Sequence, residues 1–198
     1  DRMEEIPYDE PTDLVAITVE IFTAKRAYEI SSEYRKRGVK VILGGIHTTL
    51  LPEESSQYAD SILTGDAEYM WDRVIEDLRK NELKSRYDSK IGKPQPETLT
   101  RRDIYKGKGY LPLSLMQFSR GCVFDCNFCA SSAYFNKKHY CRRVEDIVRE
   151  IEEQNLKTIF FVDDNIIGNK KAAKDLFRAL IPLKIKWGSQ ASINMTED

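Results

Sequence analysis

The sequence predicts an α/β protein made of two parallel-sheet units. Short apolar runs rich in β-branched residues alternate with segments of helical periodicity, and this alternation stops over residues 81–112 before it starts again. Strands that alternate with helices are typical of parallel sheets. We therefore expect one α/β unit over residues 1–80, a linker over residues 81–112 and a second α/β unit over residues 113–198.

The first unit is predicted from its apolar runs. A buried strand is expected at residues 13–18, and a helix that ends at a glycine is expected at 23–37. Two further strands, each stopped by glycine, are expected at 39–43 and 61–64. Apolar side chains then recur at helical spacing over residues 67–78, which predicts an amphipathic helix.

The linker and the second unit are predicted from the loss and the return of this pattern. Residues 81–112 hold glycines, prolines and many charges without periodicity, and such a stretch is unusual inside a compact domain. In the second unit, strands are predicted at 113–118, 158–162 and 185–193, with helix faces over 144–151 and 172–180.

The composition excludes several classes of protein. Charged residues make up 32% of the chain and the net charge is −1, so no basic surface indicates a nucleic-acid partner. No apolar run approaches the roughly 20 residues that span a bilayer, so we expect no membrane span. Three of the four cysteines are clustered, whereas a disulfide framework spreads its cysteines along the chain. The sequence therefore predicts a cytoplasmic protein with a metal centre.

The clustered cysteines Cys122, Cys126 and Cys129 have the spacing C-x3-C-x2-C. Three thiolates from one short loop can hold three irons of a cubane cluster and leave the fourth iron open to a chelating ligand. The loop follows a predicted strand, which places it at the carboxyl edge of a parallel sheet, where α/β active sites lie. Gly121, directly before the loop, allows the backbone to turn sharply.

This spacing, with Phe128 directly before the third cysteine, resembles the radical S-adenosylmethionine (SAM) superfamily. The strings at residues 119–129 and 160–165 are similar to its cobalamin-associated branch. The resemblance implies a [4Fe–4S] cluster held by the three cysteines, with SAM on the fourth iron through its amino and carboxylate groups. It further implies reductive cleavage of SAM to a 5′-deoxyadenosyl radical, with a reductant such as flavodoxin or ferredoxin as partner.

The same resemblance implies which other residues contact SAM. Phe128 would pack against the adenine. The turn Asp163-Asp164-Asn165 lies where the family receives the methionine amino group, and a carboxylate at a strand end can accept hydrogen bonds from an ammonium. Arg143 would reach the SAM carboxylate. The family more often has two arginines one residue apart, followed by serine, and only Arg143 matches that pattern well.

Residues 9–80 resemble the later half of a cobalamin-binding, flavodoxin-like domain. The resemblance implies that Thr18 contacts the dimethylbenzimidazole pocket and that Gly44 and Gly45 let the backbone approach the nucleotide tail closely. The complete prediction is thus a partial flavodoxin- or Rossmann-like cobalamin-binding domain followed by the first part of a radical SAM (β/α) partial barrel.

The chain departs from this branch in one respect. Members that bind cobalamin base-off usually carry an Asp-x-His-x-x-Gly loop, and this sequence has none. Its histidines are His47 and His139, and His47, which follows the two glycines, is interpreted as a loop or capping residue. The first strands of the flavodoxin-like domain and the later strands of the barrel are missing. We expect an internal piece of a longer enzyme, inactive by itself.

Three functions are compatible with these residues. The leading hypothesis is cobalamin-dependent radical SAM chemistry on a small organic substrate, with methyl transfer to an unactivated carbon. The second is a radical SAM oxidoreductase or cyclase that transfers no methyl group. The third is a binding module stabilised by zinc, with His139 or Cys141 as fourth ligand, although zinc sites usually pair their cysteines as C-x2-C at both ends.

Overall fold

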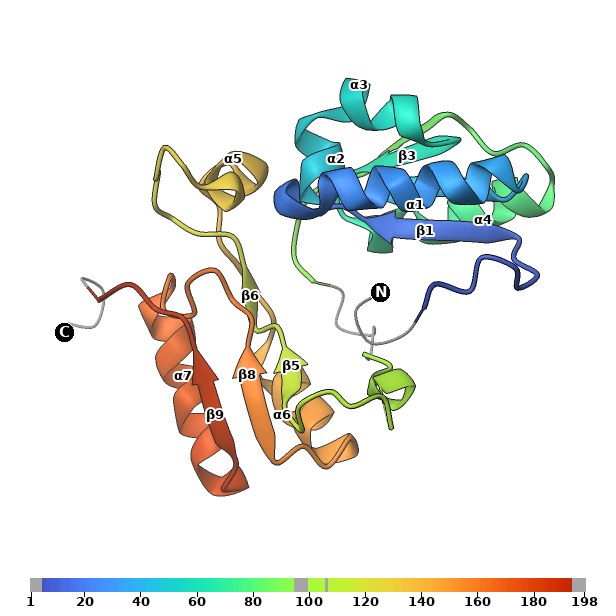
Figure 1. Ribbon diagram of the computed structural model, residues 1–198. Coiled ribbons are helices and arrows are strands. Elements are labelled where there is room, and N and C mark those ends of the chain that lie inside the picture. Colours follow the sequence, from blue (N-terminus) through green and yellow to red (C-terminus); the bar gives the residue numbers. More distant parts are fainter. Residues whose placement is uncertain (1–4, 95–99, 106, 194–198) are drawn as a thin grey trace. The chain divides into compact units, whose positions relative to one another are not determined.

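The structure is a computed structural model that describes residues 5–94, 100–105 and 107–193 (Figure 1). The chain divides into two compact units, Asp1–Gly92 and Lys93–Asp198. Each unit contains a parallel sheet with helices packed against it, which confirms the predicted α/β fold with parallel sheets. None of the helices in the described part of the chain combines the length and the apolar character needed to cross a membrane.

The first unit is built on a parallel sheet with the strand order β1-β2-β3-β4 among its described residues. Its strands are β1 Leu14–Thr18, β2 Lys40–Gly44, β3 Ser61–Thr64 and β4 Arg86–Asp88. Its α-helices are α1 Ala24–Lys36, α2 Ile46–Leu50, α3 Pro52–Ser55 and α4 Trp71–Arg79. Short 3-10 turns are η1 Ile21–Thr23, η2 Ser56–Tyr58 and η3 Ala67–Tyr69.

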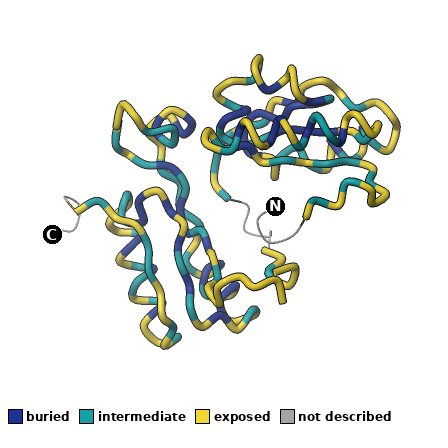
Figure 2. Tube along the Cα trace, viewed as in Figure 1, coloured by how far each residue is buried: buried dark blue, intermediate teal, exposed yellow. Residues whose placement is uncertain are grey.

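The two faces of this sheet are covered by different helices. Successive side chains of a strand point to opposite faces, and in β2 Val41 and Leu43 pack in one cluster with Tyr28 of α1. Ile42, between them, packs in another cluster with Val74 of α4. Figure 2 shows that the buried residues of this unit gather along the central strands of the sheet. Strand pairing therefore fixes the register of β1, β2 and β3, and helices pack on both faces of the sheet.

Strand β4 corrects the predicted extent of the linker. Its backbone pairs with β3 in parallel, and the first unit extends to Gly92 instead of ending at residue 80. The Tyr87 hydroxyl donates to Asp77 at 2.9 Å, and the Thr64 hydroxyl donates to Asp88 at 2.7 Å. Only one residue of this three-residue strand is buried, so the strand gives no periodic pattern and the sequence indicated a linker there.

The second unit contains a parallel sheet of order β5-β8-β9 and an antiparallel pair β6-β7 within its described residues. The strands are β5 Ser114–Met116, β6 Ser119–Arg120, β7 Tyr140–Cys141, β8 Thr158–Phe161 and β9 Lys186–Ser189. The helices are α5 Ala130–Phe135, α6 Val144–Glu153 and α7 Lys170–Leu180, with 3-10 turns η4 Arg102–Tyr105 and η5 Ile181–Leu183.

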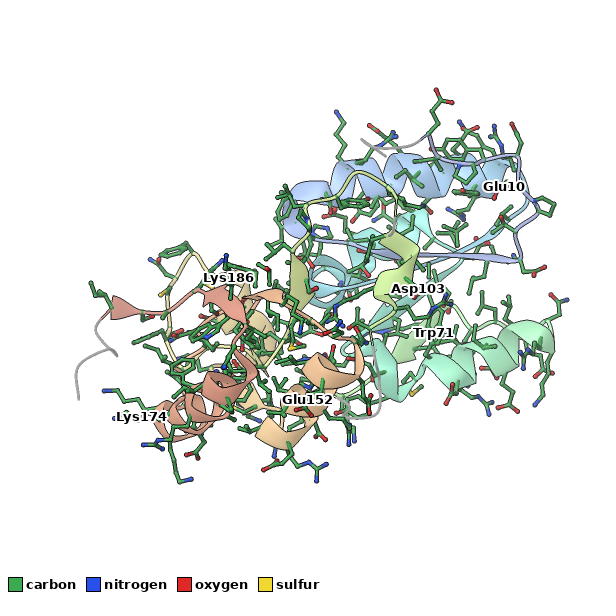
Figure 3. All side chains as sticks on the ribbon, turned by 90° about the horizontal axis from the view of Figure 1, so that it is seen from below. Glu10, Trp71, Asp103, Glu152, Lys174 and Lys186 are labelled. Carbon is green, nitrogen blue, oxygen red and sulfur yellow. The ribbon has the colours of Figure 1, made fainter. Side chains whose placement is uncertain are left out.

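Helices α6 and α7 bury their apolar faces against this sheet. Ile147 of α6, Leu176 of α7 and Phe161 of β8 belong to one buried cluster. On the opposite faces of the helices, Glu152 and Lys174 are exposed and project away from the sheet (Figure 3). Because Phe161, the last residue of β8, lies in this buried cluster, the core holds the start of the segment that follows β8.

Candidate functional site

The predicted cluster loop, residues 121–129, lies between β6 and α5 beyond the carboxyl end of β5 (Figure 1). All three of its thiols are free, with Cys126 exposed and Cys122 and Cys129 half-buried. The Cys129 N–H donates to the Cys126 carbonyl at 3.0 Å, which closes a tight turn between these two cysteines. At the start of α5 the backbone N–H of Ser132 lowers the pKa of the Cys129 thiol.

Gly121 sets the direction in which the cluster loop leaves β6. Its φ of +82° lies in the left-handed region, and a Cβ there would stand 2.2 Å from the Lys138 carbonyl oxygen. Every residue other than glycine is strained in this conformation and clashes with Lys138. The sharp turn predicted for Gly121 is confirmed.

The carboxylate of Asp163, just after β8, is buried and bound to the start of the loop region. Its oxygens accept from the backbone N–H of Phe118 at 3.2 Å and from both the backbone N–H and the hydroxyl of Ser119. Burial raises the pKa of Asp163, and the hydrogen bonds from Ser119 and Phe118 lower it in part. Asp163 thus anchors the chain where it passes from β5 to β6.

The neighbouring Asp164 and Asn165 are directed at the cluster loop itself. Asp164 is exposed, and its carboxylate accepts from the Gly121 N–H at 2.9 Å and from the Ser131 hydroxyl at 2.6 Å. The amide nitrogen of Asn165 lies 4.0 Å from the Cys122 sulfur. The structure therefore brings together the cysteines and the acidic turn, which the sequence separates by more than thirty residues.

The proposed fourth zinc ligands are engaged elsewhere. His139 contacts the Asn165 carbonyl through Nε2 at 3.2 Å and the Cys141 sulfur through Nδ1 at 3.5 Å. Burial raises the pKa of the Cys141 thiol to about 11, which disfavours the thiolate that binds metal. Within the described ranges, no three His, Cys, Asp or Glu side chains are gathered as ligands of one metal ion, and this holds for the three cysteines of the cluster loop as well. These contacts give the zinc hypothesis no support.

In the first unit, the three predicted cobalamin contacts line one cavity. Thr18, Gly44 and Gly45 lie at the carboxyl ends of β1 and β2, where Thr18 and Gly44 are paired in register. They border a cavity of about 100 Å³. Its other walls include Leu63, Ala67 and Trp71. The cavity is smaller than the roughly 300–1,000 Å³ of typical ligand pockets, so by itself it could take only part of a large ligand.

The two glycines of this cavity have different structural roles. Gly45 has a φ of +94°, and a Cβ there would lie 2.8 Å from the Val19 carbonyl oxygen, so the fold itself requires glycine. A Cβ on Gly44 would meet nothing closer than 3.4 Å, so the fold tolerates the methyl group of an alanine at this position. His47, interpreted from the sequence as a loop or capping residue, lies inside α2 instead, where it is buried and contacts the Tyr28 hydroxyl at 3.0 Å.

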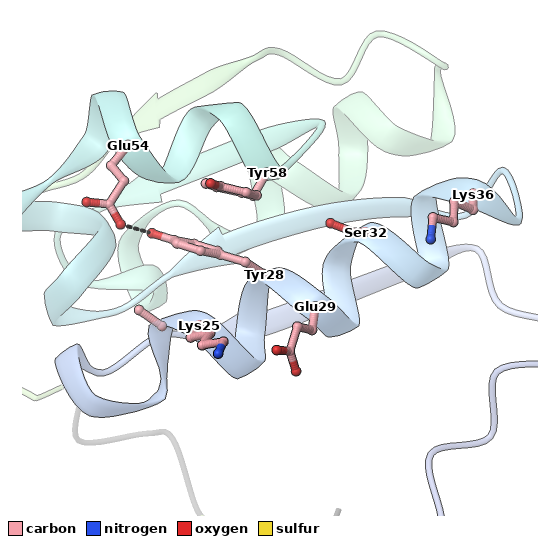
Figure 4. A pocket seen from close by; sticks show the side chains of 8 residues that line it. Lys25, Tyr28, Glu29, Ser32, Lys36, Glu54 and Tyr58 are labelled. Atoms are coloured by element: carbon pink, nitrogen blue, oxygen red, sulfur yellow. Dashed lines mark hydrogen bonds between the residues drawn. The ribbon is translucent and has the colours of Figure 1, made fainter.

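A second cavity, of about 640 Å³, runs beside α1 in the first unit (Figure 4). Tyr28 and Tyr58 stack at 4.0 Å between ring centroids, and the Tyr28 hydroxyl donates to Glu54 at 3.0 Å. Charged side chains such as Lys25 and Glu29 complete its wall. None of its lining residues was singled out by the sequence.

Comparison with known proteins identifies the second unit. Residues 116–192 match the family model described as the radical SAM superfamily. Residues 116–192 belong to the radical SAM superfamily. This confirms the predicted enzyme class, and with it the [4Fe–4S] cluster and SAM as the cofactors of such a domain.

Relatives of this radical SAM chain include methyltransferases. It is 33% identical to bacteriochlorophyllide d C-8(2)-methyltransferase of Chlorobaculum tepidum, over 98% of this chain and 47% of the relative. It is 28% identical to the C-12(1)-methyltransferase of the same organism, over 93% of this chain and 43% of the relative. The chain thus spans less than half of the length of these curated relatives.

Among solved structures, the chain resembles TsrM from Kitasatospora setae, a radical SAM methyltransferase with cobalamin and a [4Fe–4S] cluster bound. The TM-score is 0.67 at 17% identity, and the match covers 89% of this chain and 43% of TsrM. At this identity the likeness shows the fold alone.

The remaining predicted SAM contacts of the radical SAM unit lie in two different environments. Phe128 is 88% exposed on the cluster loop, so its ring is open to a ligand. Arg143 precedes α6 and donates two hydrogen bonds of 2.9 Å to Asp146. Its guanidinium is therefore engaged within its own helix rather than with the cluster loop.

Sequence reasoning missed two residues of the radical SAM site, Ser119 and Ser131, as partners of Asp163 and Asp164. Both serines flank the cluster loop, but each meets its carboxylate only through the pairing of β5 with β8. Their positions beside the cysteines were the only local signal.

Proposed function

We propose that this chain is part of a cobalamin-dependent radical SAM methyltransferase that acts on a small organic molecule. The observation that carries the proposal is the cluster loop, which presents three free thiols from one strand-to-helix connection beyond the carboxyl end of a parallel sheet. The methyltransferase names of the relatives support the transfer of a methyl group. A cytoplasmic location and a flavodoxin or ferredoxin reductant belong to the same proposal.

The donor set of the cluster loop fits a cluster with an open iron. Cys122, Cys126 and Cys129 would hold three irons as thiolates, and the lowered pKa of Cys129 favours that form. When bound, the cluster supplies the electron that cleaves SAM. Phe128, exposed directly before Cys129, offers a flat apolar surface to the adenine.

Asp163 and Arg143, the other implied SAM contacts, already make hydrogen bonds within the protein. The Asp163 carboxylate already accepts from Phe118 and Ser119, and Arg143 is held by Asp146. A role in SAM binding for Asp163 requires its buried hydrogen bonds to open, and each one lost would cost about 1.5–3 kcal/mol. A role for Arg143, whose side chain is exposed, requires it to leave Asp146. Of the acidic turn, Asp164 and Asn165 lie closest to the loop by their contacts.

The cavity beside Thr18, Gly44 and Gly45 supports the cobalamin part of the proposal. Thr18 is exposed and offers a hydroxyl, and Trp71 offers an aromatic wall to a planar base. When bound, cobalamin carries the methyl group. The cobalamin bound in TsrM is a further support, since that protein shares the fold.

The cluster is tested by anaerobic reconstitution of the chain with iron and sulfide. We expect about four irons per chain, visible Fe–S absorbance, and an EPR signal of the reduced cluster that changes when SAM is added. Serine substitution at Cys122, Cys126 or Cys129 should abolish the signal, whereas Cys141→Ser should leave it unchanged. A colourless protein with one zinc, lost equally in Cys141→Ser, would contradict the proposal.

The cobalamin site is tested by equilibrium dialysis of the chain with hydroxocobalamin. Gly44→Ala should weaken retention because the added methyl group stands at the wall of the cavity, while the thermal unfolding midpoint stays within a few degrees, since a Cβ at this position has room. Equal retention by both proteins would exclude this cavity as the cobalamin site.

A further inference from the structure

We propose that Asp164 is a positioning residue for the cluster loop, and that it acts by fixing both ends of that loop before SAM binds. This inference rests on the proposed function, because it assigns Asp164 to the assembly of the cluster. It differs from the role that the family resemblance implies, in which the acidic turn receives the SAM amino group.

The contacts of Asp164 bracket the three cysteines. One carboxylate oxygen accepts from the N–H of Gly121, the residue directly before Cys122, at 2.9 Å. The other accepts from the hydroxyl of Ser131, two residues after Cys129, at 2.6 Å. A single side chain thus joins the entrance and the exit of the loop.

The anchor itself is rigid. Asp164 follows β8, which is held between β5 and β9 by parallel pairing. The adjacent Asp163 is buried against Ser119, so the acidic turn cannot shift without breaking that contact as well. Both ends of the loop are therefore held by a residue that directly follows the central strand of the sheet, although the cysteines between them are partly exposed.

Gly121 shows why the entrance needs such an anchor. Its positive φ and its approach to Lys138 allow one backbone path into Cys122, and the amide held by Asp164 fixes that path. Three thiolates must reach three corners of one cubane at the same time, so small errors in the loop are costly. Residues that orient metal ligands in this way typically change metal affinity about 10- to 100-fold when removed.

The test compares Asp164→Ala, Ser131→Ala and the double variant with wild type, with no SAM present. Iron and sulfide per chain are measured after anaerobic reconstitution, together with the rate at which the cluster is lost to a ferrous chelator. Asp125→Ala is the matched control, because Asp125 lies in the same loop but its carboxylate makes an exposed ion pair with Lys137. Circular dichroism and thermal unfolding of the cluster-free proteins report on the fold.

We expect Asp164→Ala to lose its cluster at least tenfold faster than wild type and Asp125→Ala, with little change in the unfolding of the cluster-free protein. Ser131→Ala should show a smaller effect in the same direction, and the double variant should add little to Asp164→Ala. If Asp164→Ala fails to fold, Ser131→Ala alone decides by the same measurement.

Two results would overturn the assignment in distinguishable ways. If wild type and Asp164→Ala retain the cluster equally, and a second measurement with SAM added shows that Asp164→Ala has lost only the EPR response to SAM, Asp164 contacts SAM and does not position the loop. If wild type assembles no cluster, the proposed function fails and this assignment fails with it.

Discussion

Two half-buried thiols, Cys129 and Cys141, show how single residues of the same type are prepared for different roles. Donation from the Ser132 N–H lowers the pKa of Cys129, whereas burial raises the pKa of Cys141 to about 11. Metals bind the thiolate. The surroundings of each sulfur therefore favour Cys129 as a ligand and keep Cys141 a neutral, packed side chain.

The raised pKa of Cys141 predicts a loss of stability in alkali. The unfolded thiol titrates near about 8.5, so the folded protein binds its proton more tightly than the unfolded chain does. This contribution is complete below about pH 8.5 and is lost as the pH rises towards about 11. Urea unfolding between pH 7 and 11 should therefore show a shallower decline for Cys141→Ala than for wild type. Parallel declines would mean that the thiol is no harder to ionise in the folded protein.

At the scale of elements, long apolar patterns were predicted well. The sequence placed a helix over residues 144–151 and strands at 61–64 and 158–162, and the structure has α6, β3 and β8 there. Each of these elements buries a face, so its apolar spacing is visible in the sequence. Elements too short to show a period were missed: β6 and β7 have two residues each, and α5 has six.

The predicted linker also contains contacts that leave no periodic pattern in the sequence. Arg102, within the predicted linker, pairs with the buried Glu150 of α6 at 2.9 Å and donates to the Leu115 carbonyl at 2.8 Å. Arg142 pairs with the same Glu150 at 2.8 Å. Contacts between charged residues far apart in the sequence leave no periodic pattern, so the attachment of Arg102 to α6 could not be predicted.

The candidate site was predictable to a similar degree. Cysteine spacing predicted the cluster loop, and the loop's resemblance to a known family led to the acidic turn beside it. The partners that hold the two together, Ser131 and Gly121 on one side and Asp164 on the other, depend on the pairing of β5 with β8. Such long-range contacts follow from the fold and not from local sequence.

At the scale of the whole molecule, the described residues form separate cores. Leu43 lies in a buried cluster made only of first-unit residues, and Leu176 lies in one made only of second-unit residues. Both leucines are fully buried. Each unit therefore has a core made of its own residues.

This separation predicts two independent unfolding transitions. Leu43→Ala and Leu176→Ala are a matched pair, the same substitution at full burial, and each should destabilise its own unit by about 2–5 kcal/mol. In urea unfolding followed by hydrogen exchange and mass spectrometry, Leu43→Ala should lower the midpoint of peptides from residues 5–92 and leave those from 113–193 in place. Leu176→Ala should do the reverse. If either variant shifts both groups of peptides equally, the chain unfolds as one cooperative unit, and the two cores depend on each other for their stability.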